Sequence, residues 1–209
     1  MQRNRFLFSL VIALFLSTLA AADSVPVNMT FLYPGTNNSG GYYTYPYYFS
    51  INGGQATPLM CDSFTNHVTI GESWSANVSG LLSGKGLFGK QILDYKAAGL
   101  IFMGVMNGSI SATTGNWAVW DLFTKGITTD PAVLALEISA LTQAKHTRGS
   151  YFRGLVLYTA VGSSPGSGPQ EYIGYRTGGM STPEPGSMML LGTGLIGIAG
   201  MMRRKLLRG

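Results

Sequence analysis

This 209-residue chain contains very few of the residues that most often carry catalysis or bind metals. It has one cysteine, Cys61, and two histidines, His67 and His146. A single cysteine excludes an intrachain disulfide, and the sequence has no phosphate-binding loop or dinucleotide fingerprint. His67 follows Asp62 by five residues, which on a regular strand places the two side chains on opposite faces. We therefore predict no metal site, no cofactor and no enzymatic activity.

Charged residues are also scarce, and their distribution excludes one class of partner. They make up 11% of the chain, and the formal net charge is +5. Residues 23–183 contain eight basic and eight acidic residues, so the surplus of positive charge lies at the two ends. Nucleic-acid-binding domains usually carry a basic surface. The neutral middle of the chain therefore predicts no nucleic-acid partner, and the basic ends fit the positive-inside rule of membrane insertion.

The N-terminus is typical of a secretory signal peptide. Arg3 and Arg5 precede an apolar run at 6–16, and three alanines follow at 20–22. A charged segment, a short apolar segment and a small-residue cleavage site are the three parts of such a peptide. We predict a signal peptide at 1–22 and an exported globular domain at 23–176. An uncleaved N-terminal anchor is the alternative.

The C-terminus combines a linker at 177–186, an uncharged segment at 187–202 and a basic tail at 203–209. The uncharged segment is predicted to be a transmembrane helix, although its length of roughly 24 Å is short for a bilayer core of ~30 Å. The tail is predicted to be cytoplasmic. The residues that flank the uncharged segment are Pro183, Glu184, Pro185 and Gly186 on one side and Arg203, Arg204 and Lys205 on the other.

These three parts, in this order, resemble the PEP-CTERM sorting signal of Gram-negative bacteria. The resemblance implies recognition by an exosortase, which is a membrane-embedded processing enzyme. It also implies export through the inner membrane, anchoring in the membrane during processing, and removal of the tail. The final location would be the cell surface or the extracellular matrix. A permanent C-terminal membrane anchor is the alternative.

The middle of the chain is predicted to be an α+β domain: an antiparallel β-sheet or sandwich with about three inserted helices. Apolar residues at intervals of three and four predict helices at 87–105, 114–124 and 130–145, the last with Asp130 as its cap and Pro131 in its first turn. Strands are predicted at 42–51 with a break at Pro46, and at 57–64, 67–70, 73–78, 151–161 and 171–175.

Three segments of this domain resemble the thioester (TQXA-type) domains of bacterial surface adhesins. They are a strand with a cysteine at 59–62, a helical segment at 95–101, and the run 116–123, which is similar to the Gln-x-Ala-Ile-Trp signature of that family. In that family, a cysteine thiol and a glutamine side chain condense with loss of ammonia. The resulting internal thioester can be attacked by a nucleophile on a host or matrix surface.

Cys61 matches the cysteine of that family, and Asn116 stands where its glutamine would. Asparagine is one methylene shorter, and positioning is most of this chemistry. The resemblance therefore implies a degenerate thioester pair, and we predict that Cys61 is a free, largely buried thiol. A thioester to Asn116 or to Gln143 is the alternative.

These observations predict an exported surface or matrix protein with a non-catalytic, adhesin-like binding module, contributing to matrix or biofilm. The predicted partners are an exosortase-type enzyme, the membrane, and an exopolysaccharide or surface ligand. Trp117, Trp120 and Phe123 are predicted to be core residues. Two other functions stay open: a secreted hydrolase that uses His67, and an ice- or polysaccharide-binding module.

Overall fold

The computed structural model describes residues 26–176. The chain divides into two units after Tyr175, and the second unit lies outside the described residues except for Arg176. The predicted signal peptide, the transmembrane helix at 187–202, the tail at 203–209 and the linker residues after Arg176 also lie outside them. Within 26–176, no helix is long and apolar enough to cross a membrane.

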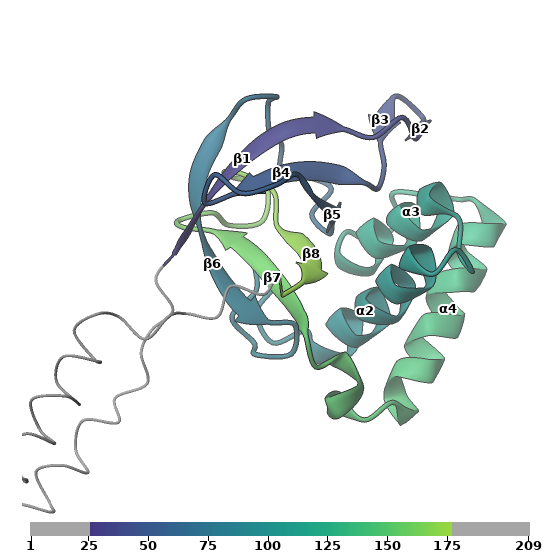
Figure 1. Ribbon diagram of the computed structural model, residues 1–209. Coiled ribbons are helices and arrows are strands. Elements are labelled where there is room, and N and C mark those ends of the chain that lie inside the picture. The colour runs from purple at the N-terminus through teal and green to yellow at the C-terminus, as the bar shows by residue number, and fades with distance from the viewer. Residues whose placement is uncertain (1–25, 177–209) are drawn as a thin grey trace, which may run out of the picture. The chain divides into compact units, whose positions relative to one another are not determined.

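Six antiparallel strands close into a barrel, in the order β1-β4-β5-β8-β7-β6 (Figure 1). The prediction of antiparallel strands around three helices is confirmed, but the sheet is closed, whereas an open sheet or sandwich was expected. Closure occurs because β1 pairs with β4 along one edge and with β6 along the other. The strands are β1 (Val27–Pro34), β4 (Tyr47–Ile51), β5 (Thr57–Cys61), β6 (Ser73–Gly80), β7 (Leu155–Ala160) and β8 (Tyr172–Tyr175).

One strand was missed and one strand prediction was wrong. Strand β1 was not predicted, although Met29 and Phe31 alternate inward with outward Asn28 and Thr30, as a half-buried strand requires. Conversely, 67–70 is a loop, because the Glu72 carboxylate accepts a hydrogen bond from the Thr69 N–H and closes a turn there. The break at Pro46 is confirmed, and it separates β4 from a two-stranded ribbon of β2 (Asn38–Ser39) and β3 (Tyr42–Tyr43).

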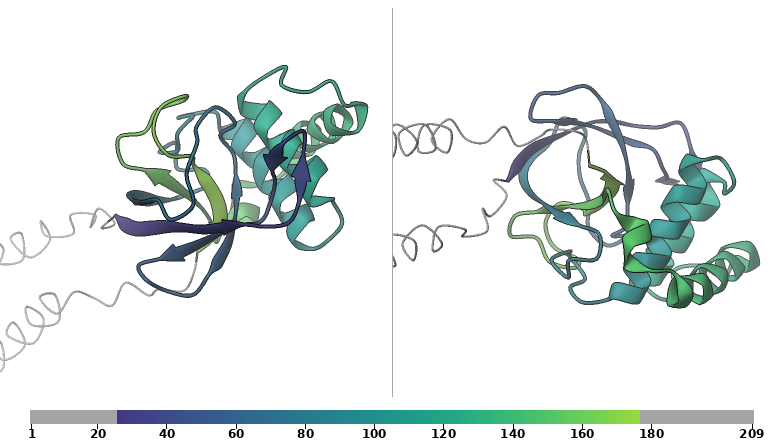
Figure 2. Two further views of the ribbon diagram at one scale, coloured as in Figure 1. Left: turned by 90° about the horizontal axis from the view of Figure 1, so that it is seen from above. Right: turned by 60° about the horizontal axis from the view of Figure 1, so that its bottom comes forward.

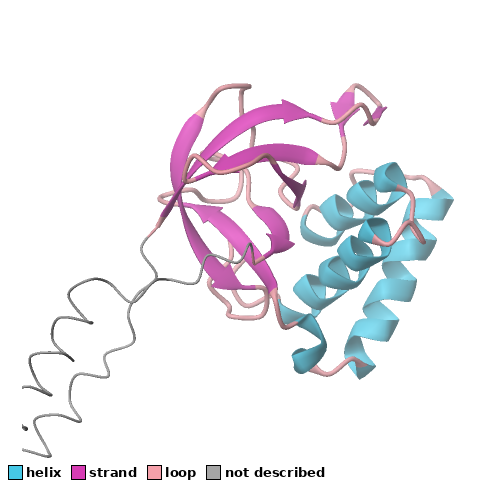
Figure 3. Cartoon of the chain, viewed as in Figure 1, coloured by secondary structure: helices cyan, strands magenta, loops and turns pink. Residues whose placement is uncertain are grey.

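The three predicted helices are α2 (Ile92–Met106), α3 (Ala112–Phe123) and α4 (Pro131–His146). Ser111 and Asp130 cap α3 and α4 by accepting backbone N–H groups of the first turn. Helix α2 begins five residues later than predicted, and a 3₁₀ helix at Gly149–Phe152 occupies the start of the segment predicted as a strand from 151. The helices pack together on one side of the barrel (Figures 2 and 3).

The core has two parts, because side chains alternate between the two faces of the barrel wall. Val156 and Tyr158 of β7 point into the barrel interior, where Trp120 of α3 joins them. Leu157 and Ile173 point outward and pack against the helices. Helix α3 therefore contributes to both parts of the core.

Candidate functional site

Cys61 is the last residue of β5 and is completely buried in the interior cluster of the barrel. The Trp120 indole N–H donates a hydrogen bond to its sulfur at 3.4 Å, and the thiol donates to the Ser63 carbonyl at 3.4 Å. Burial, followed by the nearby negative charge of Asp62, raises the pKa of the thiol to about 12, against a smaller lowering by the Trp120 bond. Cys61 is therefore a protonated thiol at neutral pH.

Asn116 lies on α3, completely buried, and its carboxamide bonds to two backbone groups. Its Nδ2 donates to the Cys61 carbonyl at 2.9 Å, and its Oδ1 accepts the Tyr45 N–H at 2.8 Å. The structure thus brings the two residues of the predicted pair together, but through the backbone of Cys61. Gln143, the other alternative partner, is an exposed residue of α4. The free thiol stays a prediction, and a thioester to either residue stays the alternative.

Sequence reasoning missed Gln170, which lies just before β8 and is only 8% exposed. Its Nε2 donates to the Ser63 carbonyl at 3.3 Å, the same oxygen that accepts the Cys61 thiol. Its Oε1 accepts the Tyr172 hydroxyl at 2.7 Å. Cys61 pairs with Tyr172 across β5 and β8. Side chains two residues apart along an extended chain point to the same side, so Gln170 points inward like Tyr172. No local motif marks this glutamine.

A small surface pocket of about 160 Å³ opens onto this site. Gln170 and Trp120 line it, together with His67, which is exposed. Aromatic residues make up most of the rest of its wall, namely Phe31, Tyr42, Tyr43, Tyr47 and Phe64. Gln170 thus lines the pocket, whereas Cys61 is completely buried and does not line it.

On the other face of the same strands, Asp62 and Glu171 form a buried carboxyl pair against α2. Glu171 accepts hydrogen bonds from the Tyr95 hydroxyl at 2.7 Å, from the Leu87 N–H at 2.7 Å and from the Thr159 hydroxyl. Asp62 has no hydrogen-bond donor on either carboxyl oxygen. Burial first, and then repulsion from Glu171, raises the pKa of Asp62 well above its ordinary value. The buried site therefore favours the protonated form of Asp62.

The described residues do not meet the requirements of a metal site. Across 26–176, no group of three or more histidine, cysteine or carboxylate side chains lies close enough to hold an ion. Asp62 and His67 are separated: the first lies in the contact between barrel and helices, and the second borders the pocket.

The C-terminal segment is matched by a model of a known sequence motif. Residues 181–205 match the PEP-CTERM protein-sorting motif. The match runs from before Pro183 to Lys205, so it includes both flanking clusters and the uncharged segment. The chain thus carries a PEP-CTERM motif, which implies export, anchoring in the membrane during sorting, and processing by an exosortase.

Among solved structures, the chain is similar to the N-terminal thioester domain of a surface protein from Clostridium perfringens. The sequence identity is 15%, the TM-score is 0.43, and the match covers 71% of this chain and 97% of the other. No curated protein matches the chain.

Proposed function

We propose that this PEP-CTERM protein is an exported, surface-sorted adhesin that attaches to its target through an internal thioester between Cys61 and Gln170. The shared Ser63 carbonyl supports the proposal most directly, because the thiol and the carboxamide both donate a hydrogen bond to this one oxygen. The domain would react once and would not turn over, so it would not be an enzyme. This proposal replaces the expectation of a permanently free thiol.

The bond would form by acyl transfer. The sulfur of Cys61 attacks the side-chain carbonyl carbon of Gln170, an S–C bond forms, and the C–N bond breaks. The thiol proton goes to the departing nitrogen, so ammonia leaves and the atoms balance. The Tyr172 hydroxyl already donates to Gln170 Oε1 and would stabilise the negative charge that develops there.

The same geometry supports a reaction with an outside nucleophile. An amine or hydroxyl in the small pocket would attack the acyl carbon from the solvent side, forming an amide or ester with Gln170 and releasing the Cys61 thiol. The Trp120 N–H would stabilise the departing sulfur. His67 borders the pocket and could accept the proton of the nucleophile.

Intact mass of the exported protein tests the thioester. We expect a deficit of one ammonia, a Cys61 that resists alkylation, and recovery of an alkylatable thiol after methylamine treatment. Gln170→Ala should abolish the deficit, and the matched variant Gln143→Ala should retain it.

Full mass together with a freely alkylatable Cys61 would refute the proposal and restore the free-thiol prediction. A deficit that survives Gln170→Ala and disappears in Asn116→Ala would assign the bond to Asn116. The hydrolase alternative has no comparable support: among the described residues, His67 forms no hydrogen bond to a serine or carboxylate.

A further inference from the structure

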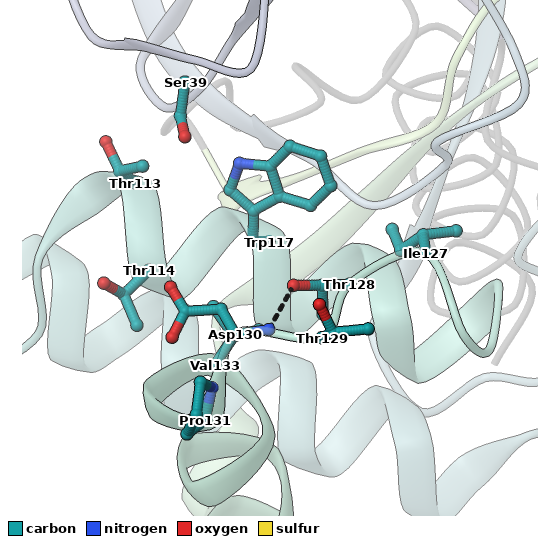
Figure 4. A pocket seen from close by; sticks show the side chains of 10 residues that line it. All are labelled: Ser39, Thr113, Thr114, Trp117, Ile127, Thr128, Thr129, Asp130, Pro131 and Val133. Atoms are coloured by element: carbon teal, nitrogen blue, oxygen red, sulfur yellow. Dashed lines mark hydrogen bonds between the residues drawn. The ribbon is translucent and has the colours of Figure 1, made fainter.

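A second, larger cavity of about 560 Å³ lies beside the N-terminal ends of α3 and α4, with the β2–β3 ribbon over it (Figure 4). Its volume is within the range of ordinary ligand pockets. Hydroxyl side chains and one indole dominate its wall. The lining residues that bear on binding are Ser39, Trp117, Thr128, Thr129 and Asp130.

Several polar groups of this cavity are free to bind a ligand. Within 26–176, the hydroxyls of Ser39 and Thr129 make no hydrogen bond. Asp130 uses one carboxylate oxygen to cap α4 through the Ala132 N–H, and its second oxygen makes no bond to the described residues. Thr128 already accepts the Asp130 N–H at 3.1 Å. The cavity therefore offers both donors and acceptors at its rim.

The charge and the apolar surface of the cavity narrow the class of ligand. No lysine, arginine or histidine lines it, and Asp130 would repel an anion such as phosphate or a carboxylate. Trp117 contributes an aromatic ring to the wall, and its Nε1 atom is buried without a hydrogen-bond partner among the described residues. An uncharged molecule with many hydroxyls and an apolar C–H surface matches these features.

We infer that this cavity binds a neutral saccharide unit of a polysaccharide. The C–H face of a sugar ring would pack on Trp117, and its hydroxyls would bond to Ser39, Thr129 and Asp130. Binding itself does not depend on the thioester.

The position of the cavity suggests a second consequence, which rests on the proposed function. The Trp117 ring is 5.3 Å from the ring of Trp120, and Trp120 borders the pocket at Gln170. A bound polysaccharide would therefore be held beside the reactive carboxamide, which would favour acylation of its own hydroxyl or amino groups.

The test measures reversible binding of the full chain, purified in a zwitterionic detergent without a sugar headgroup. Immobilised neutral glucan, galactan and mannan are compared with acidic alginate, after methylamine treatment has opened any thioester. We expect binding to at least one neutral polysaccharide and none to alginate. Thr129→Val removes one hydroxyl without changing shape and should weaken binding about threefold to tenfold. Asp130→Asn keeps a helix cap and should weaken it more.

Thr142→Val is the matched control, because Thr142 is exposed on α4 away from the cavity. It should leave binding unchanged. Binding to alginate alone, binding to none of the polysaccharides, or equal binding by all three variants would overturn the saccharide assignment. Since methylamine-treated protein is used, each of these results is independent of the ammonia deficit that tests the thioester.

Discussion

At the scale of single residues, the fold favours the protonated form of one buried acidic side chain. Asp62 is completely buried, and its carboxyl faces Glu171 without a donor of its own. Its pKa is raised in the folded protein, so the folded state binds a proton that the unfolded state releases once the pH exceeds about 4. The stability from this group is fully present below that pH and is lost as the pH rises toward the folded-state pKa.

Asp62→Asn should therefore stabilise the domain at neutral pH. The amide has nearly the same shape, needs no proton and can donate to Glu171. Each pKa unit by which folding shifts a group is worth about 1.4 kcal/mol. In urea unfolding between pH 4 and pH 8, the free energy of unfolding of the variant should increase relative to that of the parent as the pH rises. Curves that stay parallel over this range would contradict a raised pKa of Asp62.

Asn116 illustrates how far a residue's role could be predicted. Its sequence context indicated a place beside Cys61, and the structure puts it there, with its carboxamide bonded to the backbone on both sides. Gln170 could not be predicted in this way. It reaches Ser63 across 107 residues of sequence, through the pairing of β5 with β8, and no local pattern encodes that pairing.

Asn116→Ala should destabilise the domain, because it leaves the Cys61 carbonyl and the Tyr45 N–H buried without a partner. Each such group costs about 1–3 kcal/mol, so we expect a loss of about 2–6 kcal/mol in urea unfolding. If Gln170 forms the thioester, the folded fraction of this variant should still show the ammonia deficit. A loss below about 0.5 kcal/mol would mean that the two hydrogen bonds do not hold α3 to β5.

At the scale of elements, the helices were predictable and the barrel was not. Helices α3 and α4 have caps and apolar periodicity within their own sequence, so local chemistry defines them. Closure of the barrel depends on β1 meeting β6, two strands far apart in the sequence. Polar residues at alternate positions of β1 lowered its apparent strand character, because only one of its faces is buried.

The close approach of α2 and α3 at Gly115 can be tested by mutation. A Cβ on Gly115 of α3 would lie 2.4 Å from Val105 Cγ2 of α2, and a branched side chain has little freedom to yield. Gly115→Ala should therefore cost about 1–3 kcal/mol in thermal or urea unfolding. Gly80→Ala is the control: a Cβ there meets nothing within 4 Å. Equal stability of the two variants would show that α2 and α3 do not approach so closely.

At the scale of the whole molecule, the domain and the motif at 181–205 have separable tasks. Residues 23–183 carry no net charge, whereas the C-terminal tail is basic and overlaps the sorting motif.

If the motif acts as a processing signal, surface fractions should contain peptides of the domain and lack any peptide from 187–209 by mass spectrometry. Replacing Arg203, Arg204 and Lys205 with alanine should prevent processing and retain the full-length chain in the membrane, while Gln170→Ala should be processed normally. Recovery of surface protein that still contains Arg203, Arg204 and Lys205 would instead identify the segment as a permanent anchor, and the domain would then act while tethered to its own membrane.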